Sequence, residues 1–161
     1  MAYDLTTGST TNHMSRTGAN VPYTVEKVVS IADAIAVKGS ALVTTDILEV
    51  IPVPANTLVH GAVAYVSSAE TSSGVTVDIG FAGGDTFIDG GAITSTGWLA
   101  KGTNGLLPFG ASSTIVTAAD TIDMEIIFSG SAPVDGVIRV VAFMTDLAEI
   151  PGPAEAARDV A

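Results

Sequence analysis

The sequence predicts an all-β fold: an antiparallel β-sandwich or jelly roll of roughly eight strands, with a flexible N-terminal arm and a short C-terminal tail. Segments rich in β-branched and aromatic residues alternate apolar and polar positions with a period of two. Clusters of Gly, Ser, Asp and Pro separate these segments, as turns between strands require. No segment repeats at a fixed period, which argues against a solenoid or a propeller.

Six segments carry a strong strand pattern, and weaker signals occur near residues 97–100 and 113–116. In the first strong segment, Tyr23 and Val25 share one face because side chains alternate along a strand. Two prolines end or edge the second segment, since proline cannot donate to a strand ladder. The six strong segments are residues 21–31, 45–55, 56–68, 74–81, 120–130 and 136–147.

The domain organisation follows from where this strand pattern begins and ends. Residues 1–21 are rich in Thr, Ser, Gly and Asn, which predicts an arm that is disordered or lies along a partner surface. Residues 22–147 form the predicted sandwich domain, and residues 148–161 form a C-terminal tail. Helical patterns occur only as about one turn after Ile31 and at residues 153–161, where a proline begins the segment.

Charge and composition exclude several classes of function. The chain has 6 Lys and Arg against 17 Asp and Glu, giving a net charge of −11, so we expect no nucleic-acid partner. It has no cysteine, which excludes disulfides, thiolate catalysis and Cys-ligated zinc. Residues 1–20 lack the apolar core of a signal peptide. The most apolar window, residues 47–66, contains a glutamate and two prolines, so we expect no membrane span.

The chain is nevertheless apolar for a protein with so many acidic residues. Its mean hydropathy is +0.50, and charged residues make up 14% of it, where about 25% is usual. Burial of part of the surface against copies of itself or against a partner explains this composition. A surface rich in Ala, Gly, Ser and Thr explains it equally well.

Candidate catalytic residues are sparse, and we predict that the protein is not an enzyme. The histidines are His13, in the predicted arm, and His60, in a predicted strand, where a structural and hydrogen-bonded role is expected. No serine lies in a G-x-S-x-G elbow. Asp123 and Glu125 share a strand face and could form a hydrolase pair, but a solvated sheet face explains them better.

The segment DIGFAGGDTFIDGG, residues 78–91, is the one candidate metal loop. Asp78, Asp85 and Asp89 could supply oxygen ligands to calcium if the glycine-rich turn folds back. The spacing does not match an EF-hand, and two glycine turns flanking a short strand explain the segment better, with the aspartates holding backbone amides. We therefore predict no metal and no cofactor, and retain calcium as the alternative.

Five segments carry a resemblance to a known family: PYTVEKVVSI, DILEVIPVPANTLVHGAVAYV, GVTVDIGFAGGDTFIDGG, TAADTIDMEI and GVIRVVAFMTDL. In their wording and order, over residues 23–147, the chain resembles small virion structural proteins of tailed bacteriophages, of the capsid decoration (cement) type. The chain departs from that family's pattern at FAGGD, residues 81–85. The resemblance implies a module, often trimeric, that binds the major capsid protein on the outer face of the head and bridges its subunits. It also implies synthesis in the host cytoplasm and no catalytic residues.

Two sets of residues are candidates for contact with a partner. For a decoration protein, we expect contacts to the capsid or to other copies from both ends of the chain: Tyr3, Leu5, Arg16, Tyr23, Pro151 and Val160. The alternative function is a receptor- or glycan-binding module of a head or tail fibre, in which Trp98, Phe109 and Tyr65 would stack on sugars. These aromatics would otherwise lie in the core or in a trimer interface.

Overall fold

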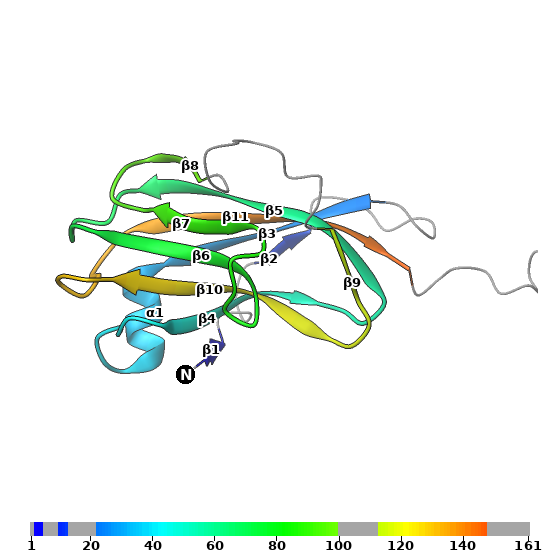
Figure 1. Ribbon diagram of the computed structural model, residues 1–161, viewed down its shortest axis with the longest axis horizontal. Coiled ribbons are helices and arrows are strands. Elements are labelled where there is room, and N and C mark those ends of the chain that lie inside the picture. The colour runs from blue at the N-terminus through cyan, green and yellow to red at the C-terminus, as the bar shows by residue number, and fades with distance from the viewer. Residues whose placement is uncertain (1, 5–9, 13–21, 100–112, 148–161) are drawn as a thin grey trace, which may run out of the picture.

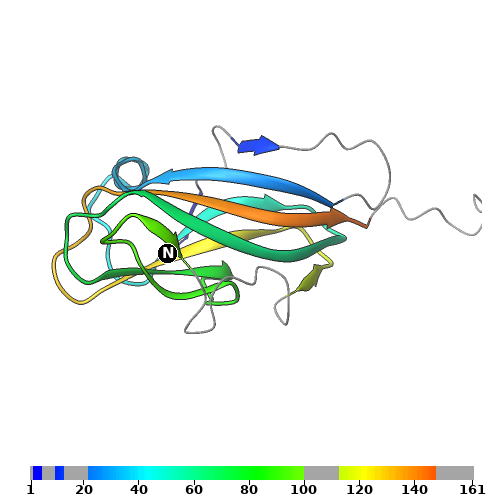
Figure 2. The same cartoon turned by 90° about the horizontal axis from the view of Figure 1, so that it is seen from above.

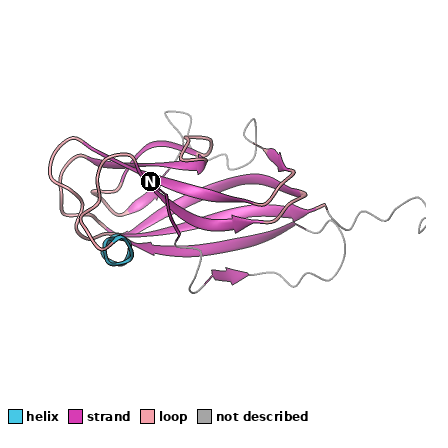
Figure 3. Ribbon diagram, turned by 90° about the horizontal axis from the view of Figure 1, so that it is seen from below, coloured by secondary structure: helices cyan, strands magenta, loops and turns pink. Residues whose placement is uncertain are grey.

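The computed structural model describes residues 2–4, 10–12, 22–99 and 113–147 of the chain, and it confirms the predicted β-sandwich. Two sheets pack face to face, and one short helix lies at one end of them (Figures 1 and 3). The elements are β1 (Ala2–Asp4), β2 (Thr10–Asn12), β3 (Pro22–Ser30), α1 (Ile31–Lys38), β4 (Asp46–Val53), β5 (Thr57–Ser68), β6 (Val75–Phe81), β7 (Ile88–Ala92), β8 (Gly97–Leu99), β9 (Thr114–Val116), β10 (Asp120–Phe128) and β11 (Val137–Asp146).

The strands divide between the sheets in a nested order. One sheet has the order β1-β4-β10-β6-β7, and the other has the order β2-β3-β11-β5-β8, with β9 pairing to the opposite end of β5 (Figure 2). Within them β3 pairs with β11, β4 with β10, β5 with β8, and β6 with β7, so the chain is a long antiparallel ribbon folded over on itself. The described pairings are antiparallel except that of β1 with β4, which is parallel.

The core forms between the two sheets because the strand pattern has a period of two. Along β3, Tyr23, Val25, Lys27 and Val29 point inward and are buried, as the alternation predicts. The other long strands contribute branched aliphatic residues and methionine in the same way. The largest fully buried side chains on the strands are Leu48, Ile51, Ile79, Ile88, Ile122, Met124, Ile126, Ile138 and Met144.

Two short strands fall inside the segment that the sequence predicts as a structureless arm. β1 pairs with the edge strand β4 of one sheet, and β2 pairs with the edge strand β3 of the other. The arm therefore contributes to both sheets, and it covers one edge of each. An unpaired edge exposes backbone donors and acceptors, so this pairing protects the two edges from indiscriminate strand addition.

Helix α1 is longer than the single turn that the sequence predicts, and local capping explains its length. The Ser30 hydroxyl accepts a hydrogen bond from the amide of Asp33 at 3.3 Å, and Gly39 ends the helix with a φ of 75°. Ile31 and Ala34 are buried against the sandwich. Among the described residues, no helix is long and apolar enough to cross a membrane.

A buried carboxylate fastens two loops at the end of the sandwich where α1 lies. Glu70, in the β5–β6 loop, is 3% exposed and accepts a hydrogen bond from the amide of Ser72 at 2.9 Å. It also accepts the amides of Val134 at 3.2 Å and Asp135 at 3.0 Å, which belong to the β10–β11 loop. Both loops cross between the sheets, so this one side chain links the two crossings.

We expect Glu70→Ala to lower the free energy of unfolding by about 2–4 kcal/mol, because several buried amides would lose a charged acceptor. Glu70→Gln keeps one acceptor oxygen and should cost about half as much. Urea unfolding of the two variants and of the exposed neighbour variant Ser73→Ala measures the difference. A loss for Glu70→Ala no larger than that for Ser73→Ala would show that the loops do not depend on this carboxylate.

Candidate functional site

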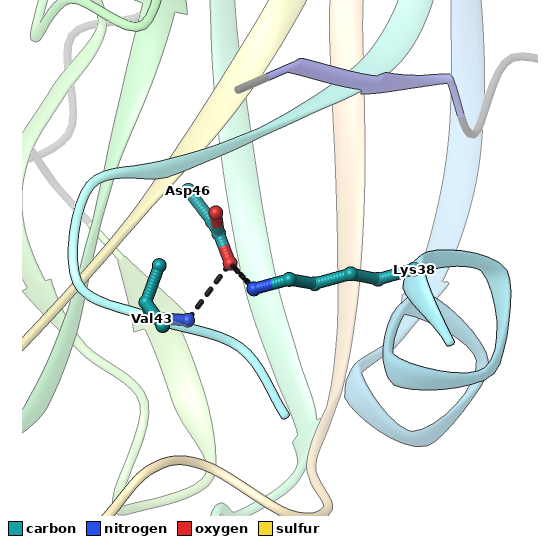
Figure 4. Close-up of polar contacts among 3 residues, drawn as sticks. All are labelled: Lys38, Val43 and Asp46. Carbon is teal, nitrogen blue, oxygen red and sulfur yellow. Dashed lines mark hydrogen bonds and ion pairs between the residues drawn. The ribbon is translucent and has the colours of Figure 1, made fainter. Parts of the chain in front are cut away.

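A buried ion pair joins the end of α1 to the start of β4. Lys38 Nζ lies 2.6 Å from Asp46 Oδ2, and the two side chains are 9% and 3% exposed. The same carboxylate oxygen accepts the amide of Val43 at 2.8 Å (Figure 4). Gly39 ends the helix directly after Lys38, so Lys38 lies in the last turn, where a basic residue complements the helix dipole.

This ion pair is also where the first strand of the chain docks. β1 lies in register with β4, so that Tyr3 is the partner of Leu48. The Tyr3 ring packs against the core, and Lys38 Nζ lies 5.5 Å from its centroid, a cation–π contact. The Lys38 ammonium thus holds β1, α1 and β4 together.

The other predicted contact residues have different positions. Tyr23 is 6% exposed on the inner face of β3, so the prediction that it contacts a partner is wrong in this fold: the alternation of the strand turns it into the core. Leu5, Arg16, Pro151 and Val160 lie outside the described residues.

The glycine-rich segment 78–91 forms a turn that folds back over β6. Asp78 Oδ1 accepts the amide of Gly90 at 2.6 Å, so this aspartate holds a backbone amide. A Cβ on Gly80 would collide with the backbone of Gly84, and therefore only glycine fits where the turn crosses the strand. Residues 90 and 91 lie inside β7, which corrects the prediction of a second glycine turn there. The pairing of β6 with β7 is instead irregular at this place.

The three aspartates predicted as calcium ligands do not form a cluster. Asp85 and Asp89 are exposed, while Asp78 is half-buried and bonded to the Gly90 amide. Across the described residues, no group of three or more His, Asp and Glu side chains is arranged to hold a metal ion. Segment 78–91 is therefore a strand, a turn and a second strand.

The pair Asp123 and Glu125 departs from the sequence prediction, because Asp123 is buried. On β10 Asp123 lies between the inward-facing Ile122 and Met124, so it is on the outer face of the sheet, and it is only 5% exposed because the 81–84 turn covers it. Its carboxylate accepts the hydroxyl of Thr121 at 2.6 Å and the amide of Gly83 at 3.2 Å. Burial raises the pKa of Asp123, and the two hydrogen bonds oppose that rise. The Asp123 carboxylate thereby holds the 81–84 turn against β10.

The predicted structural role of His60 is confirmed. Its Nε2 lies 2.8 Å from the Thr145 hydroxyl, which joins β5 to β11. The imidazole is half-buried on the strand. The hydrogen bond therefore fixes two neighbouring strands.

The aromatic candidates occupy the edge of the six-stranded sheet. Trp98, on β8, is 60% exposed, so of the two alternatives to sugar stacking the core is excluded for it and the trimer interface stays a prediction. Tyr65 pairs with it across the strands, and their rings meet edge to face with centroids 5.1 Å apart. Phe109 lies outside the described residues. β8 is the edge strand of its sheet, so no further strand lies beside it, and the indole is left exposed to solvent.

The two outer faces of the sandwich differ in charge. The five-stranded sheet carries half-exposed or exposed carboxylates, and we call this surface the acidic face; they are Glu49, Asp78, Asp89 and Glu125. The six-stranded sheet carries apolar residues around one ion pair, and we call this surface the apolar face. It consists of Val28, Val63, Tyr65, Trp98 and Val141, with Glu26 and Arg139 paired at 3.1 Å.

We expect Asp46→Ala to cost about 3–5 kcal/mol of unfolding free energy, because it leaves the Lys38 ammonium buried without its partner. Lys38→Ala and the double variant complete a double-mutant cycle, and a coupling of about 1–3 kcal/mol is expected for such a pair. Urea denaturation measures all four proteins. Additive losses would show that the two charges do not stabilise each other.

The raised pKa of Asp123 predicts a specific pH dependence. A native pKa above the ordinary value of 3.8 means that the folded state holds the proton more tightly, so stability falls as the pH rises from 3.8 through the native pKa. Asp123→Asn removes this titration. We therefore expect wild type to lose stability relative to Asp123→Asn as the pH rises above 3.8, measured by urea unfolding. A difference that stays constant with pH would contradict the burial effect.

Comparison with solved structures shows what this fold is similar to. No protein-family model and no curated protein sequence matches the chain. A chain of the cyanophage Pam1 capsid asymmetric unit matches with a TM-score of 0.56 and 14% identity, covering 83% of this chain and 93% of that one. A chain of the capsid of Ralstonia phage GP4 matches with a TM-score of 0.56 and 14% identity, covering 83% and 89%. This chain therefore shares its fold with chains found in phage capsids.

Proposed function

We propose that this chain is a non-enzymatic structural protein of a bacteriophage virion. The observation that carries the proposal is the extent of the fold match: the similarity covers 83% of this chain and 93% of a chain from the Pam1 capsid. The sequence resemblance to small phage virion proteins points to the same class from separate features, the wording of residues 74–91 and 117–126.

The polar groups that could have carried chemistry support this non-enzymatic role. His60 is hydrogen-bonded to Thr145, and Asp123 is buried under a turn with its oxygens on Thr121 and Gly83. A hydrolase using Asp123 would need that carboxylate to reach a substrate, and the 81–84 turn covers it.

The finer proposal is a decoration (cement) protein on the outer face of the head. The nested pairing of β3 with β11 and β6 with β7 supports a jelly roll, a compact module common in capsids. In this proposal residues 22–147 are the module, and the segments 1–21 and 148–161 lash it to the major capsid protein. The protein is proposed to act as a homotrimer, with neither nucleic acid nor membrane as partner.

Stabilisation of a shell by such a protein follows from binding linkage. A protein that binds assembled subunits and not dissociated ones shifts the equilibrium toward the shell, by an amount that grows with its affinity and concentration. Several weak contacts made at once by a multimer add up to a firm attachment. The protein therefore needs surfaces and arms, and no reactive group.

A mixture of the purified protein with shells that lack it tests this function. We expect electron cryomicroscopy to show density on the outer face, bridging capsid subunits, and we expect the shells to resist heating better. A variant lacking residues 1–20 should occupy at least about tenfold fewer sites at equal concentration, because its proposed capsid contacts are gone. The deletion also removes β1 and β2 from the edges of the two sheets, so the folding of the variant must be measured as well.

Circular dichroism melting of the truncated variant separates loss of binding from loss of folding. Equal occupancy and equal heat protection by the truncated protein would remove the role of the arm. Absence of the full-length protein from the head, or its presence only on tail fibres, would remove the decoration role itself.

The second candidate function, a glycan- or receptor-binding module, has one observation in its favour. The indole of Trp98 is 60% exposed and held edge to face by Tyr65, which is how a sugar-stacking platform could be presented. A glycan array, read together with immunolabelling of intact particles, distinguishes the two functions. Binding to a sugar that Trp98→Ser abolishes, with label on fibres, would favour this alternative.

A further inference from the structure

We propose that copies of this chain associate through the apolar face, the outer surface of the six-stranded sheet, centred on Tyr65 and Trp98. This inference deepens the homo-oligomer of the proposed function by naming the surface that joins the copies. It does not require that the protein bind a phage shell, so the two can fail separately.

The strand register gathers the apolar face into a continuous row. Arg139 on β11 is the partner of Val28 on β3 and of Tyr65 on β5, and Tyr65 is the partner of Trp98 on β8. These four side chains lie side by side across four strands, because cross-strand partners point to the same side of a sheet. The row therefore spans the sheet from β3 to its β8 edge.

A second row runs beside the first. Val141 on β11 is the partner of Glu26 on β3 and of Val63 on β5, two residues away from the first row along each strand. Side chains two apart on a strand share a face, so the two rows form one surface. Arg139 lies in the middle of this surface, between Val28 and Tyr65.

The side chains of the apolar face are more exposed to solvent than apolar side chains that only stabilise the fold would be. Trp98 is 60% exposed and Val28 is 48% exposed, at opposite ends of the first row. The outer face of a sandwich sheet that meets only water is normally polar. Exposed apolar patches that have a few polar residues at their edge mark contact sites for other proteins. Tryptophan and tyrosine are also the residue types that dominate binding energy at such sites.

Charge decides which partner fits. Within the two rows the charged side chains are Glu26 and Arg139, and they neutralise each other at 3.1 Å. The opposite side of the molecule is the acidic face, which carries Glu49, Asp78 and Glu125. The described lysines do not neutralise the acidic face, because Lys27 is buried in β3 and Lys38 pairs with Asp46.

A second copy of the chain is therefore the partner that this surface fits. Each copy carries a net charge of −11, so most mutual orientations bring carboxylates together. Contact between two apolar faces, or between one apolar face and a neutral part of another copy, avoids that repulsion and buries the tryptophan. It also accounts for a mean hydropathy of +0.50 with only 14% charged residues.

The chain supplies its own reporter for this contact, since Trp98 is its single tryptophan. Analytical ultracentrifugation and tryptophan emission are measured on the full-length protein over one concentration series. We expect the mass to rise from the 16.2 kDa chain to a multiple of it. Over the same range the emission should shift to the blue and acrylamide quenching should fall, because the indole leaves water.

Two charge-adding variants make a matched pair. Val28→Glu puts a carboxylate into the apolar face and keeps Trp98 as reporter, whereas Val37→Glu adds the same charge to a valine on α1 that is 58% exposed. We expect Val28→Glu to raise the dissociation constant at least about tenfold and to keep the emission that of an exposed indole. Val37→Glu should associate like wild type. Trp98→Ser, followed by mass alone, should weaken association at least about tenfold as well.

Three results would overturn the inference. The first is a protein of a single chain's mass, with exposed-indole emission, across the whole series. The second is a multimer that Val28→Glu and Trp98→Ser leave intact while far-UV circular dichroism shows both variants folded, because the copies would then join elsewhere. The third is a glycan that shifts the Trp98 emission of the monomer, which would give this face to a sugar. Failure to bind shells by a protein that still associates through this face would instead remove the proposed function.

Discussion

The fold depends on the insertion of its last two strands into the middle of the two sheets. β10 lies between β4 and β6, and β11 lies between β3 and β5, so neither sheet is continuous until the C-terminal third of the domain has paired. Such long-range pairing is slow to form, because the chain must close large loops before it gains contacts. Once complete, the two sheets pack against each other. A substitution that destabilises β10 or β11 is therefore expected to destabilise both sheets.

Carboxylates serve this architecture as acceptors for backbone amides, and the acidic composition is partly explained by that role. Glu70 fastens two crossings, Asp46 holds the loop before β4, and Asp78 and Asp123 secure opposite sides of the 80–90 turn. Each of them satisfies amides that a turn leaves without a partner. An aspartate in a glycine-rich segment is therefore not by itself a sign of a metal site.

The strands were predictable from sequence because burial on one face leaves a period of two, as the alternation of Tyr23 and Val25 shows. The burial of Asp123 was not, since the turn that covers it belongs to a segment 40 residues earlier in the chain. β1 and β2 were also missed, because three-residue strands owe their existence to edges formed elsewhere in the chain. The exposure of Trp98 depends likewise on β8 being an edge, which only the assembled sheet determines.

The two outer faces of the sandwich differ in charge, so the molecule presents unlike surfaces on its two sides. Rows of carboxylates on one sheet repel like surfaces, and this repulsion falls off over about 8 Å at physiological salt, so it acts mainly when copies are close. The apolar face carries no such barrier, because its one ion pair is internally neutral. When two copies approach to within a few ångströms, the repulsion therefore disfavours contacts through the acidic face and leaves contacts through the apolar face. A protein that must take one fixed place among many copies gains from that sorting more than from affinity alone, since it suppresses the wrong contacts.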